Sequence, residues 1–122
     1  MIQGYFGDRG ELFFEIDLIT VDGSVFTVNA LLDTGFTNWL AMDIQDIDSL
    51  GWSYVREQDM RTARGNLRFN LYQGHVYFDG LQLSIPVLGG RQFTEVLLGL
   101  PWLETRRLVV DRKAGLVTLK VA

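Results

Sequence analysis

The 122-residue sequence contains no cysteine, and this absence removes several kinds of chemistry at once. A protein without thiols has no disulfide framework, no thiolate nucleophile and no thiolate metal ligand. Histidine is almost absent too, because His75 is alone in the chain, at the start of an apolar segment. A lone strand histidine is more often structural than a metal ligand, so a metal-dependent hydrolase is a weak alternative. We expect no metal and no cofactor.

Positive charge is scarce. The chain carries 11 Lys and Arg against 15 Asp and Glu, with a formal net charge of −4 and an isoelectric point near 4.8. Nucleic-acid backbones and anionic membranes are bound through basic patches. The only basic clusters are the short pairs Arg106-Arg107 and Arg112-Lys113. We therefore expect neither a nucleic acid nor a membrane as the main partner.

Long hydrophobic runs are missing as well. No apolar stretch approaches the roughly 20 residues of a membrane-spanning helix. The segment from Met1 to Asp8 lacks the basic region and apolar core of a signal peptide, which favours a soluble cytoplasmic protein. The hydrophobic fraction of 48% is typical of a folded chain, and 122 residues suffice for one domain but not for two. Residues 1–122 are expected to form a single domain.

The stretch from Ala30 to Phe36 is the most informative part of the chain. An apolar run typical of a buried strand ends abruptly at Asp33, Thr34 and Gly35. We expect the Asp33 carboxylate to lie against hydrophobic walls, where burial disfavours its charged form and prepares it for proton transfer. Thr34 can donate and accept hydrogen bonds, and Gly35 lets another backbone or a substrate come close. The alternative is a simple turn, because all three residue types are common in turns.

The rest of the sequence predicts mainly strands. Alternating apolar residues predict a strand from Glu11 to Val21, and the pair Asp22-Gly23 turns it into a second strand, Val25 to Leu32, which leads to Asp33. Further predicted strands are Ile2 to Phe6, Trp39 to Met42, Trp52 to Val55, Leu67 to Tyr72, two strands within Val76 to Leu88, Val96 to Leu98, Leu108 to Asp111, and Leu116 to Val121. The polar segment Arg56 to Asn66 is expected to turn at its glycine, and Gly89-Gly90 to end a strand.

Two short helices are predicted. Asp43 is a plausible N-cap for a helix with Ile44, Ile47 and Leu50 on one face, closed by Gly51. A second helix is predicted from Pro101 to Arg106, since proline favours a first helical turn. Two short helices are too few to serve as crossovers in a parallel sheet. The chain is therefore expected to be mostly β, as a closed or folded-over barrel.

Two separated motifs resemble those of the retropepsin-like aspartic proteases, the single-domain relatives of the retroviral protease and of pepsin. The motifs are Leu31-Leu32-Asp33-Thr34-Gly35 and, much later, Val96-Leu97-Leu98-Gly99 followed by a helix, with a hairpin between them where that family carries its flap. The bacterial members are most similar, because their Asp-Thr-Gly is followed by Phe, a small polar pair, an apolar strand and a helix. The resemblance implies an acid-protease β-barrel that forms a two-fold homodimer.

The resemblance also implies roles for the first motif. Asp33 takes the position of the catalytic aspartate. Thr34 takes that of the residue whose hydroxyl locks the two active-site loops together across the dimer, and Gly35 that of the glycine facing the substrate. Phe36 is left open between a substrate pocket and the core.

The remaining positions of the resemblance lie behind and above this loop. Leu97, Leu98 and Gly99 correspond to the strand that threads behind the active-site loop. The tip at Thr62, Ala63, Arg64 and Gly65 corresponds to a flap that closes over an extended polypeptide substrate through backbone groups. Trp39, Trp52 and Trp102 could line substrate pockets, although core packing is the usual role of large aromatics.

The sequence departs from the retroviral members of the family at one structural feature. Those enzymes follow their glycine with Ala and two acids and place an Arg after the later glycine, which makes an ion pair. Here Phe36, Thr37 and Asn38 follow the first glycine and Leu100 follows the second, so that ion pair cannot form. We expect the dimer to be held in another way, through the apolar C-terminal strand Leu116 to Val121.

Aspartic-protease chemistry needs two carboxylates that share a proton, and one chain offers one suitable aspartate. Asp43 is predicted to cap a helix and Asp111 to lie in a turn. The sequence therefore predicts an aspartic endopeptidase in which Asp33 meets its symmetry mate in a homodimer. The alternative is a catalytically silent peptide-binding or dimerisation module with the same fold.

Overall fold

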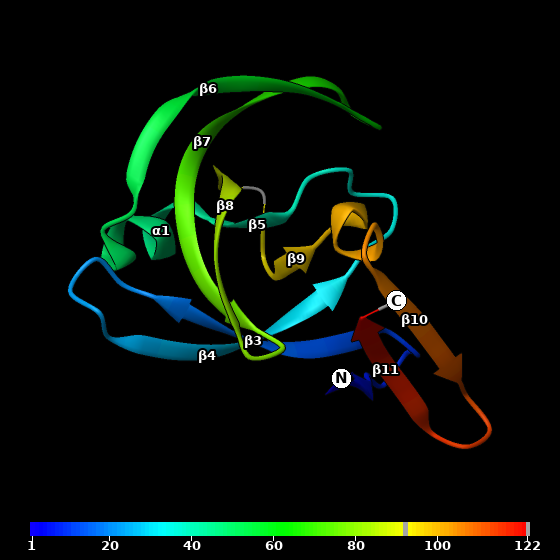
Figure 1. Ribbon diagram of the computed structural model, residues 1–122. Helices are drawn as coiled ribbons and strands as arrows, with labels where there is room; N and C mark the ends of the chain where they lie inside the picture. The colour runs from blue at the N-terminus through cyan, green and yellow to red at the C-terminus, as the bar shows by residue number, and fades with distance from the viewer. Residues whose placement is uncertain (92, 122) are drawn as a thin grey trace.

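The computed structural model describes residues 1–91 and 93–121, which form a β-barrel and a smaller sheet (Figure 1). The strands are β1 (Ile2–Gln3), β2 (Tyr5–Phe6), β3 (Leu12–Ile19), β4 (Val25–Leu32), β5 (Leu40–Asp43), β6 (Ser53–Thr62), β7 (Gly65–Phe78), β8 (Leu81–Gly90), β9 (Val96–Leu98), β10 (Arg106–Asp111) and β11 (Leu116–Val121). Strands β3-β4-β9-β5-β8-β7 close into a barrel because β3 also pairs with β7. The predicted mostly-β barrel is confirmed.

The hairpin of β3 and β4 carries the chain to the rim of the barrel. Phe14, Ile16 and Leu18 are buried while Glu15 between them is exposed, which is the period-two pattern of a strand with one face on the core. The two strands pair antiparallel from Phe13 opposite Leu31 to Ile19 opposite Val25, as predicted. Strand β4 ends at Leu32, so the next residue, Asp33, lies at the rim.

Strand β9 fills the gap between β4 and β5. Leu97 pairs with Leu31 of β4 in parallel and with Ala41 of β5 in antiparallel orientation. The loop 33–39 leaves β4 and returns as β5, so it must pass around the end of β9. A strand enclosed by neighbours on both sides is typically apolar throughout, which explains the uninterrupted run Val96–Leu98.

Gly99 lies at the point where the loop 33–39 passes β9. A Cβ atom at this position would lie 1.7 Å from the carbonyl oxygen of Asn38 and 2.7 Å from that of Phe36. The Gly99 N–H donates to the carbonyl of Trp39 over 3.2 Å, and the Leu100 N–H donates to that of Phe36 over 2.8 Å. A side chain at position 99 would therefore collide with the backbone that the neighbouring amides hold.

The hairpin of β6 and β7 is longer than the sequence predicts, because separate short strands with a polar segment between them were expected here. Most of the predicted strand Trp52 to Val55 and of the polar segment after it forms one strand, β6, which ends at Thr62 and has a bulge between Tyr54 and Arg56. Strand β7 runs without interruption, because Gly74 stays in register opposite Ile85 of β8. Strand β6 is an edge strand, where exposed charged residues are common, so its polarity does not prevent pairing.

Gly89 and Gly90 do not break the strand after Leu88 as predicted, because they are the last two residues of β8. Both glycines are buried within the strand, and Gly89 pairs with Met42 of β5. A Cβ at Gly89 would lie 2.8 Å from the Ile47 side chain and 2.9 Å from the Tyr72 ring. The glycine therefore provides space for close packing across the strand, which is the other common reason for glycine in a strand interior.

The first predicted helix is confirmed as α1 (Ile44–Leu50). The Asp43 carboxylate accepts from the Gln45 N–H over 2.8 Å as an N-cap, and Gly51 closes the helix with a left-handed φ of 77°. The second helix was predicted from Pro101 to Arg106, and the structure has a shorter 3₁₀ helix over Leu100–Leu103. Arg106 instead begins β10, where its buried guanidinium lies over the rings of Phe78 and Trp102.

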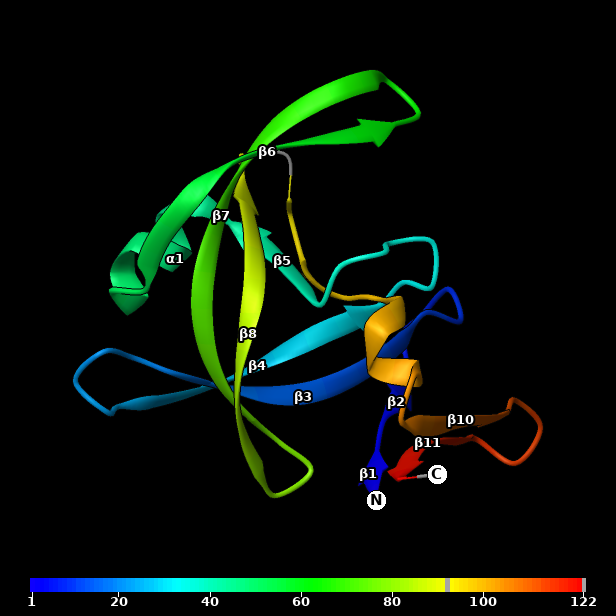
Figure 2. The same cartoon turned by 45° about the horizontal axis from the view of Figure 1, so that its top comes forward.

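The two ends of the described chain meet in the separate sheet, of order β1-β11-β10. The predicted first strand Ile2 to Phe6 is divided at Gly4 into β1 in the small sheet and β2 beside β3. A side chain at Gly4 would collide with the Phe13 carbonyl and the Phe14 ring. Strand β11 is the middle strand, paired with β1 at Leu119 and with β10 along its length. The hairpin of β10 and β11 projects away from the barrel (Figure 2). Among residues 1–91 and 93–121, no helix has the length and apolar character needed to cross a membrane.

The close approach at Gly99 predicts that Gly99→Ala destabilises the fold strongly. The new methyl group cannot be accommodated without moving the loop 33–39, so we expect a loss of more than about 3 kcal/mol in the free energy of unfolding. Urea unfolding followed by tryptophan fluorescence measures it. Gly115→Ala is the control, because Gly115 has a φ of 69° and open space around it, and should lose only about 1 kcal/mol. Equal losses in the two variants would contradict the steric role of Gly99.

Candidate active site

The backbone of Asp33 is fixed from two sides. Its N–H donates to the carbonyl of Leu98 over 2.8 Å, and its carbonyl accepts from the N–H of Phe36 over 3.1 Å. The first bond extends the pairing of β4 with β9 by one residue, and the second closes a tight turn over residues 33–36. Asp33 is thus tied directly to the strand that the sequence places behind the loop.

The side chain of Asp33 differs from the sequence expectation. Asp33, Thr34 and Gly35 are all exposed in the single chain, so the expected hydrophobic walls around the carboxylate are absent from the described residues. The carboxylate oxygen Oδ1 accepts from the Gly35 N–H over 2.9 Å, which orients the side chain within its own turn. The chain returns to the interior only at Phe36, which is 7% exposed.

Leu97, Leu98 and Gly99, which the resemblance assigns to a strand behind the loop, lie next to the loop 33–39 in the structure. Leu98 is fully buried and accepts from Asp33, while Leu97 is half-buried between β4 and β5. Gly99 and Leu100 then hold the far side of the loop through the carbonyls of Trp39 and Phe36. The structure therefore brings Asp33 and the segment 97–99 together through backbone contacts.

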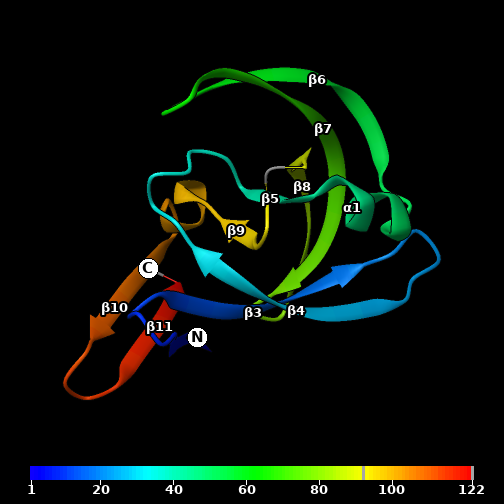
Figure 3. The ribbon, with the colours of Figure 1, turned by 180° about the vertical axis from the view of Figure 1, so that it is seen from behind.

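The tip of the β6–β7 hairpin is a tight turn at Ala63 and Arg64. The Thr62 hydroxyl donates to the Gly65 carbonyl over 2.9 Å and accepts from the Arg64 N–H over 3.1 Å. Gly65 has a φ of 98°, which explains the glycine at this place. The hairpin arches over the barrel and its tip lies on the same side of the molecule as the loop 33–39, from the front and from behind (Figures 1 and 3).

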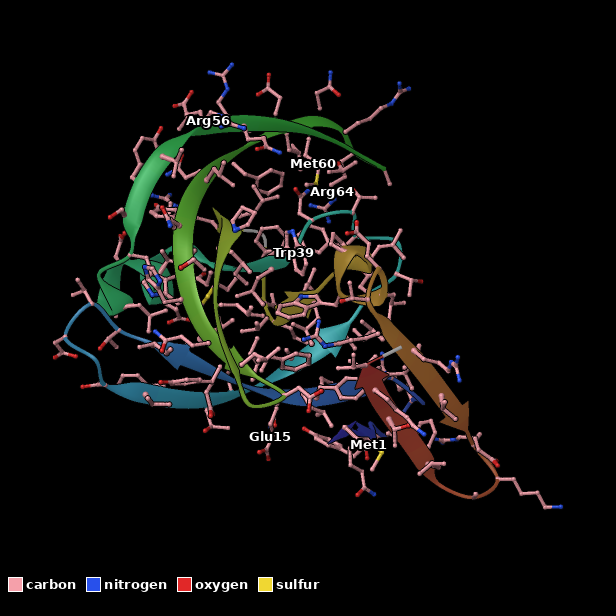
Figure 4. All side chains as sticks on the ribbon, in the orientation of Figure 1. Met1, Glu15, Trp39, Arg56, Met60 and Arg64 are labelled. Carbon is pink, nitrogen blue, oxygen red and sulfur yellow. The ribbon has the colours of Figure 1, made fainter. Side chains whose placement is uncertain are left out.

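A small apolar cluster connects this hairpin with the Asp33 loop. We call it the Phe36 cluster, and its buried members are Phe36, Ala41, Phe69, Leu71 and Leu88, with Met60, Leu67, Phe93 and Leu97 packed against them. Figure 4 shows Met60 on the inner side of the hairpin. The cluster therefore places apolar groups from the hairpin and from the loop on the same side of the barrel.

Sequence reasoning found Phe36 but missed its partners from the hairpin. Met60, Leu67 and Phe69 alternate with exposed residues on both sides of the tip, and this period-two pattern is the signal that could have found them. The outer side is charged, because Arg68 contacts Glu57 over 3.3 Å and Asp59 over 3.1 Å. The hydrogen bond to Asp59 raises the pKa of the Arg68 guanidinium. The hairpin thus has a charged outer face and an apolar inner face.

The other two aspartates considered in the sequence, and the single histidine, each make local hydrogen bonds within the fold. Asp43 caps α1, and Asp111 accepts from the Ala114 N–H over 3.0 Å in the β10–β11 turn. His75 is half-buried on β7, and its Nδ1 lies 3.0 Å from the Ser84 hydroxyl. Among residues 1–91 and 93–121, no group of three or more histidine or carboxylate side chains is placed to hold a metal ion.

The three tryptophans lie mainly in the core. Trp52 and Trp102 are 6% and 0% exposed, and Trp39, in the loop 33–39, is half-buried. The rings of Trp39 and Trp102 meet edge to face at 5.0 Å. The preference for core packing is therefore confirmed for Trp52 and Trp102.

No protein-family model matches the sequence, and no curated protein matches it. Solved structures do match. One is the crystal structure of a retropepsin-like aspartic protease from Rickettsia conorii, which is 19% identical, gives a TM-score of 0.68 and covers 97% of this chain and 88% of its own. Another is the solution structure of Simian foamy virus (mac) protease, which is 17% identical, gives a TM-score of 0.53 and covers 79% of this chain and 99% of its own. These likenesses show that the chain has the retropepsin-like fold.

Proposed function

We propose that the protein is an aspartic endopeptidase that hydrolyses peptide bonds as a homodimer, with a water activated between Asp33 and its symmetry mate. The observation that carries this proposal is the Asp33 turn. A carboxylate is held at the barrel rim, oriented by Gly35 N–H and anchored through its backbone to β9, on the side where the hairpin tip lies. The retropepsin-like fold supports the same conclusion at the level of the protein class.

The exposure of the motif supports a dimeric site. A single chain supplies one carboxylate at this place, and the reaction needs a second to share the proton. In a two-fold dimer whose axis passes beside Asp33, the exposed residues Asp33, Thr34 and Gly35 become covered by their own copies. The two carboxylates then titrate as a pair, with one acting as base toward water and the other as acid toward the substrate carbonyl.

An extended polypeptide is the proposed substrate. A strand-like peptide between the Asp33 loop and the hairpin tip can hydrogen-bond with backbone groups of the tip while its side chains alternate between the two subunits. The apolar inner face of the hairpin, with Met60 and Leu67 beside the Phe36 cluster, would form the nearest wall of such a groove. Thr62, Ala63, Arg64 and Gly65 then act as the flap.

Replacement of the proposed catalytic group should abolish cleavage. In a homodimer, Asp33→Asn replaces both of the carboxylates that share a proton. The value of kcat/KM for unstructured peptides between about pH 3 and 7 should therefore fall by at least about 10³-fold. Asp111→Asn is the control, because Asp111 lies in the β10–β11 turn, and it should keep wild-type activity. Cleavage that persists in Asp33→Asn would refute the assignment. Absence of cleavage in a wild-type protein shown to be dimeric would favour a silent peptide-binding module.

Activity should also depend on association of two chains. Thr34→Val removes the hydroxyl proposed to join the two loops, so specific activity should be lost at low protein concentration and recovered at high concentration. Sedimentation velocity over the same concentration range measures the dimer directly. Thr37→Val is the matched control, since Thr37 is exposed in the same loop. A specific activity independent of concentration while the protein stays monomeric would exclude the shared site.

The inner face of the hairpin should contribute to substrate binding. Met60→Ala removes an apolar side chain of the proposed groove, so KM should rise by about 5- to 150-fold, which corresponds to about 1–3 kcal/mol for a lost hydrophobic pocket contact. Asp59→Ala is the control, because Asp59 lies next to Met60 but faces outward to Arg68. Steady-state kinetics with one peptide substrate measures both. An equal rise of KM in the two variants would argue against a groove on the inner face.

A further inference from the structure

Trp102 makes the side-chain contact that joins the 3₁₀ helix to the loop carrying Asp33. Its indole Nε1–H donates to the carbonyl oxygen of Trp39 over 2.7 Å. The same oxygen accepts from the Gly99 N–H over 3.2 Å, so two donors hold one carbonyl. The neighbouring contacts between the loop and the segment 98–100 join backbone atoms, at Asp33 and at Phe36. Trp102 therefore adds a side-chain donor to an otherwise backbone-built attachment.

The indole of Trp102 is fixed before it reaches the loop. The side chain is fully buried, and its ring meets that of Phe78 at 4.7 Å and that of Trp39 at 5.0 Å. The guanidinium of Arg106 lies over the Trp102 ring at 5.4 Å. A ring enclosed in this way has little rotational freedom. Because packing already fixes its orientation, the hydrogen bond from its N–H to the Trp39 carbonyl costs little additional side-chain conformational entropy.

We propose that Trp102 is a positioning residue for Asp33. It holds the Trp39 end of the loop 33–39, while the pairing of Asp33 with Leu98 holds the other end, and together they set where the carboxylate stands. Its kinetic consequence rests on the proposed protease function, whereas its effect on the order of the loop does not. Displacement of a catalytic group by about 1 Å can lower a rate by about 10²-fold, so loss of one anchor should be visible in kcat.

The chain offers a matched control in Trp52. Trp52 is also buried, and its indole N–H also donates to a backbone carbonyl over 2.7 Å, that of Ile19. Ile19 pairs with Val25, at the opposite end of β4 from Asp33. Trp52→Phe and Trp102→Phe therefore remove the same kind of hydrogen bond from two buried indoles, one remote from the loop and one attached to it.

The experiment compares these two variants in kinetics and in amide hydrogen exchange. At equal folded fraction, kcat of Trp102→Phe should fall between about tenfold and a hundredfold with little change in KM, whereas kcat of Trp52→Phe should stay within about twofold of wild type. The amides of Gly99 and Leu100 should exchange at least about tenfold faster in Trp102→Phe than in Trp52→Phe, after correction for global stability. Equal kcat and equal exchange in the two variants would overturn the proposal.

Two further outcomes separate this proposal from that of the protease. If the wild-type protein cleaves no peptide, hydrogen exchange alone decides, and faster exchange confined to Trp102→Phe supports the positioning role. If Trp102→Phe does not fold, 3-benzothienylalanine placed at position 102 keeps the ring shape and replaces the N–H by sulfur. That variant should fold and show the same rapid exchange at Gly99 and Leu100, and wild-type exchange in it would refute the role of the hydrogen bond.

Discussion

The passage of the loop 33–39 around the end of β9 is the constraint on which the site depends. Strand β9 comes from late in the sequence, yet it separates two strands, β4 and β5, that the loop connects. The crossing is possible only because residue 99 is a glycine, since a Cβ atom would stand 1.7 Å from the Asn38 carbonyl oxygen. The loop is then held through its backbone by Leu98, Gly99 and Leu100. Asp33 thus owes its position to long-range pairing, and its short turn with Gly35 supplies only the final orientation of the carboxylate.

The single chain presents the proposed site with one exposed aspartate. Asp33, Thr34 and Gly35 are exposed, while Phe36 immediately after them is buried. The Asp-Thr-Gly turn therefore lies on the surface, and the chain enters the packed interior at Phe36. Burial of Asp33 and a second carboxylate would both come from a second copy of the same loop, which is the physical reason for the dimer in the proposed mechanism. Within the small sheet, both neighbours of β11 come from its own chain. A partner that paired with this sheet would therefore meet the outer edge of β10 or of β1, whereas β11 could contribute only through its side chains.

Local sequence rules predicted those parts of the fold that local interactions determine. The β3–β4 hairpin, the Asp43 cap and the run Val96–Leu98 all carry their signal within a few residues, and each lies where it was expected. The errors arose where tertiary contacts decide. Gly89 resembles a strand breaker but makes space for Ile47 and Tyr72, and Arg106 resembles the end of a helix but packs on Phe78 and Trp102 as part of β10. For the proposed site, the motif predicted Asp33 and the segment 97–99. The exposure of Asp33 and the packing of Met60 against the Phe36 cluster depend on distant elements that the sequence pattern alone did not place.

The Trp102 contact gives a physical account of how the loop is held without an ion pair. In the retroviral enzymes that the sequence resembles, an acid after the first glycine and an Arg after the second form such a pair, and here Phe36 and Leu100 occupy the region instead. A buried ion pair stabilises a small barrel only if the attraction between its two charges offsets the free energy of removing both from water. The Trp102 indole N–H is neutral, so its hydrogen bond to the Trp39 carbonyl, which also accepts from Gly99, requires no charge to be removed from water. The indole ring also adds buried apolar area. The consequence is that the geometry of the loop is coupled to core packing around Trp102 rather than to surface charge, so it should be insensitive to salt but sensitive to changes in the interior of the barrel.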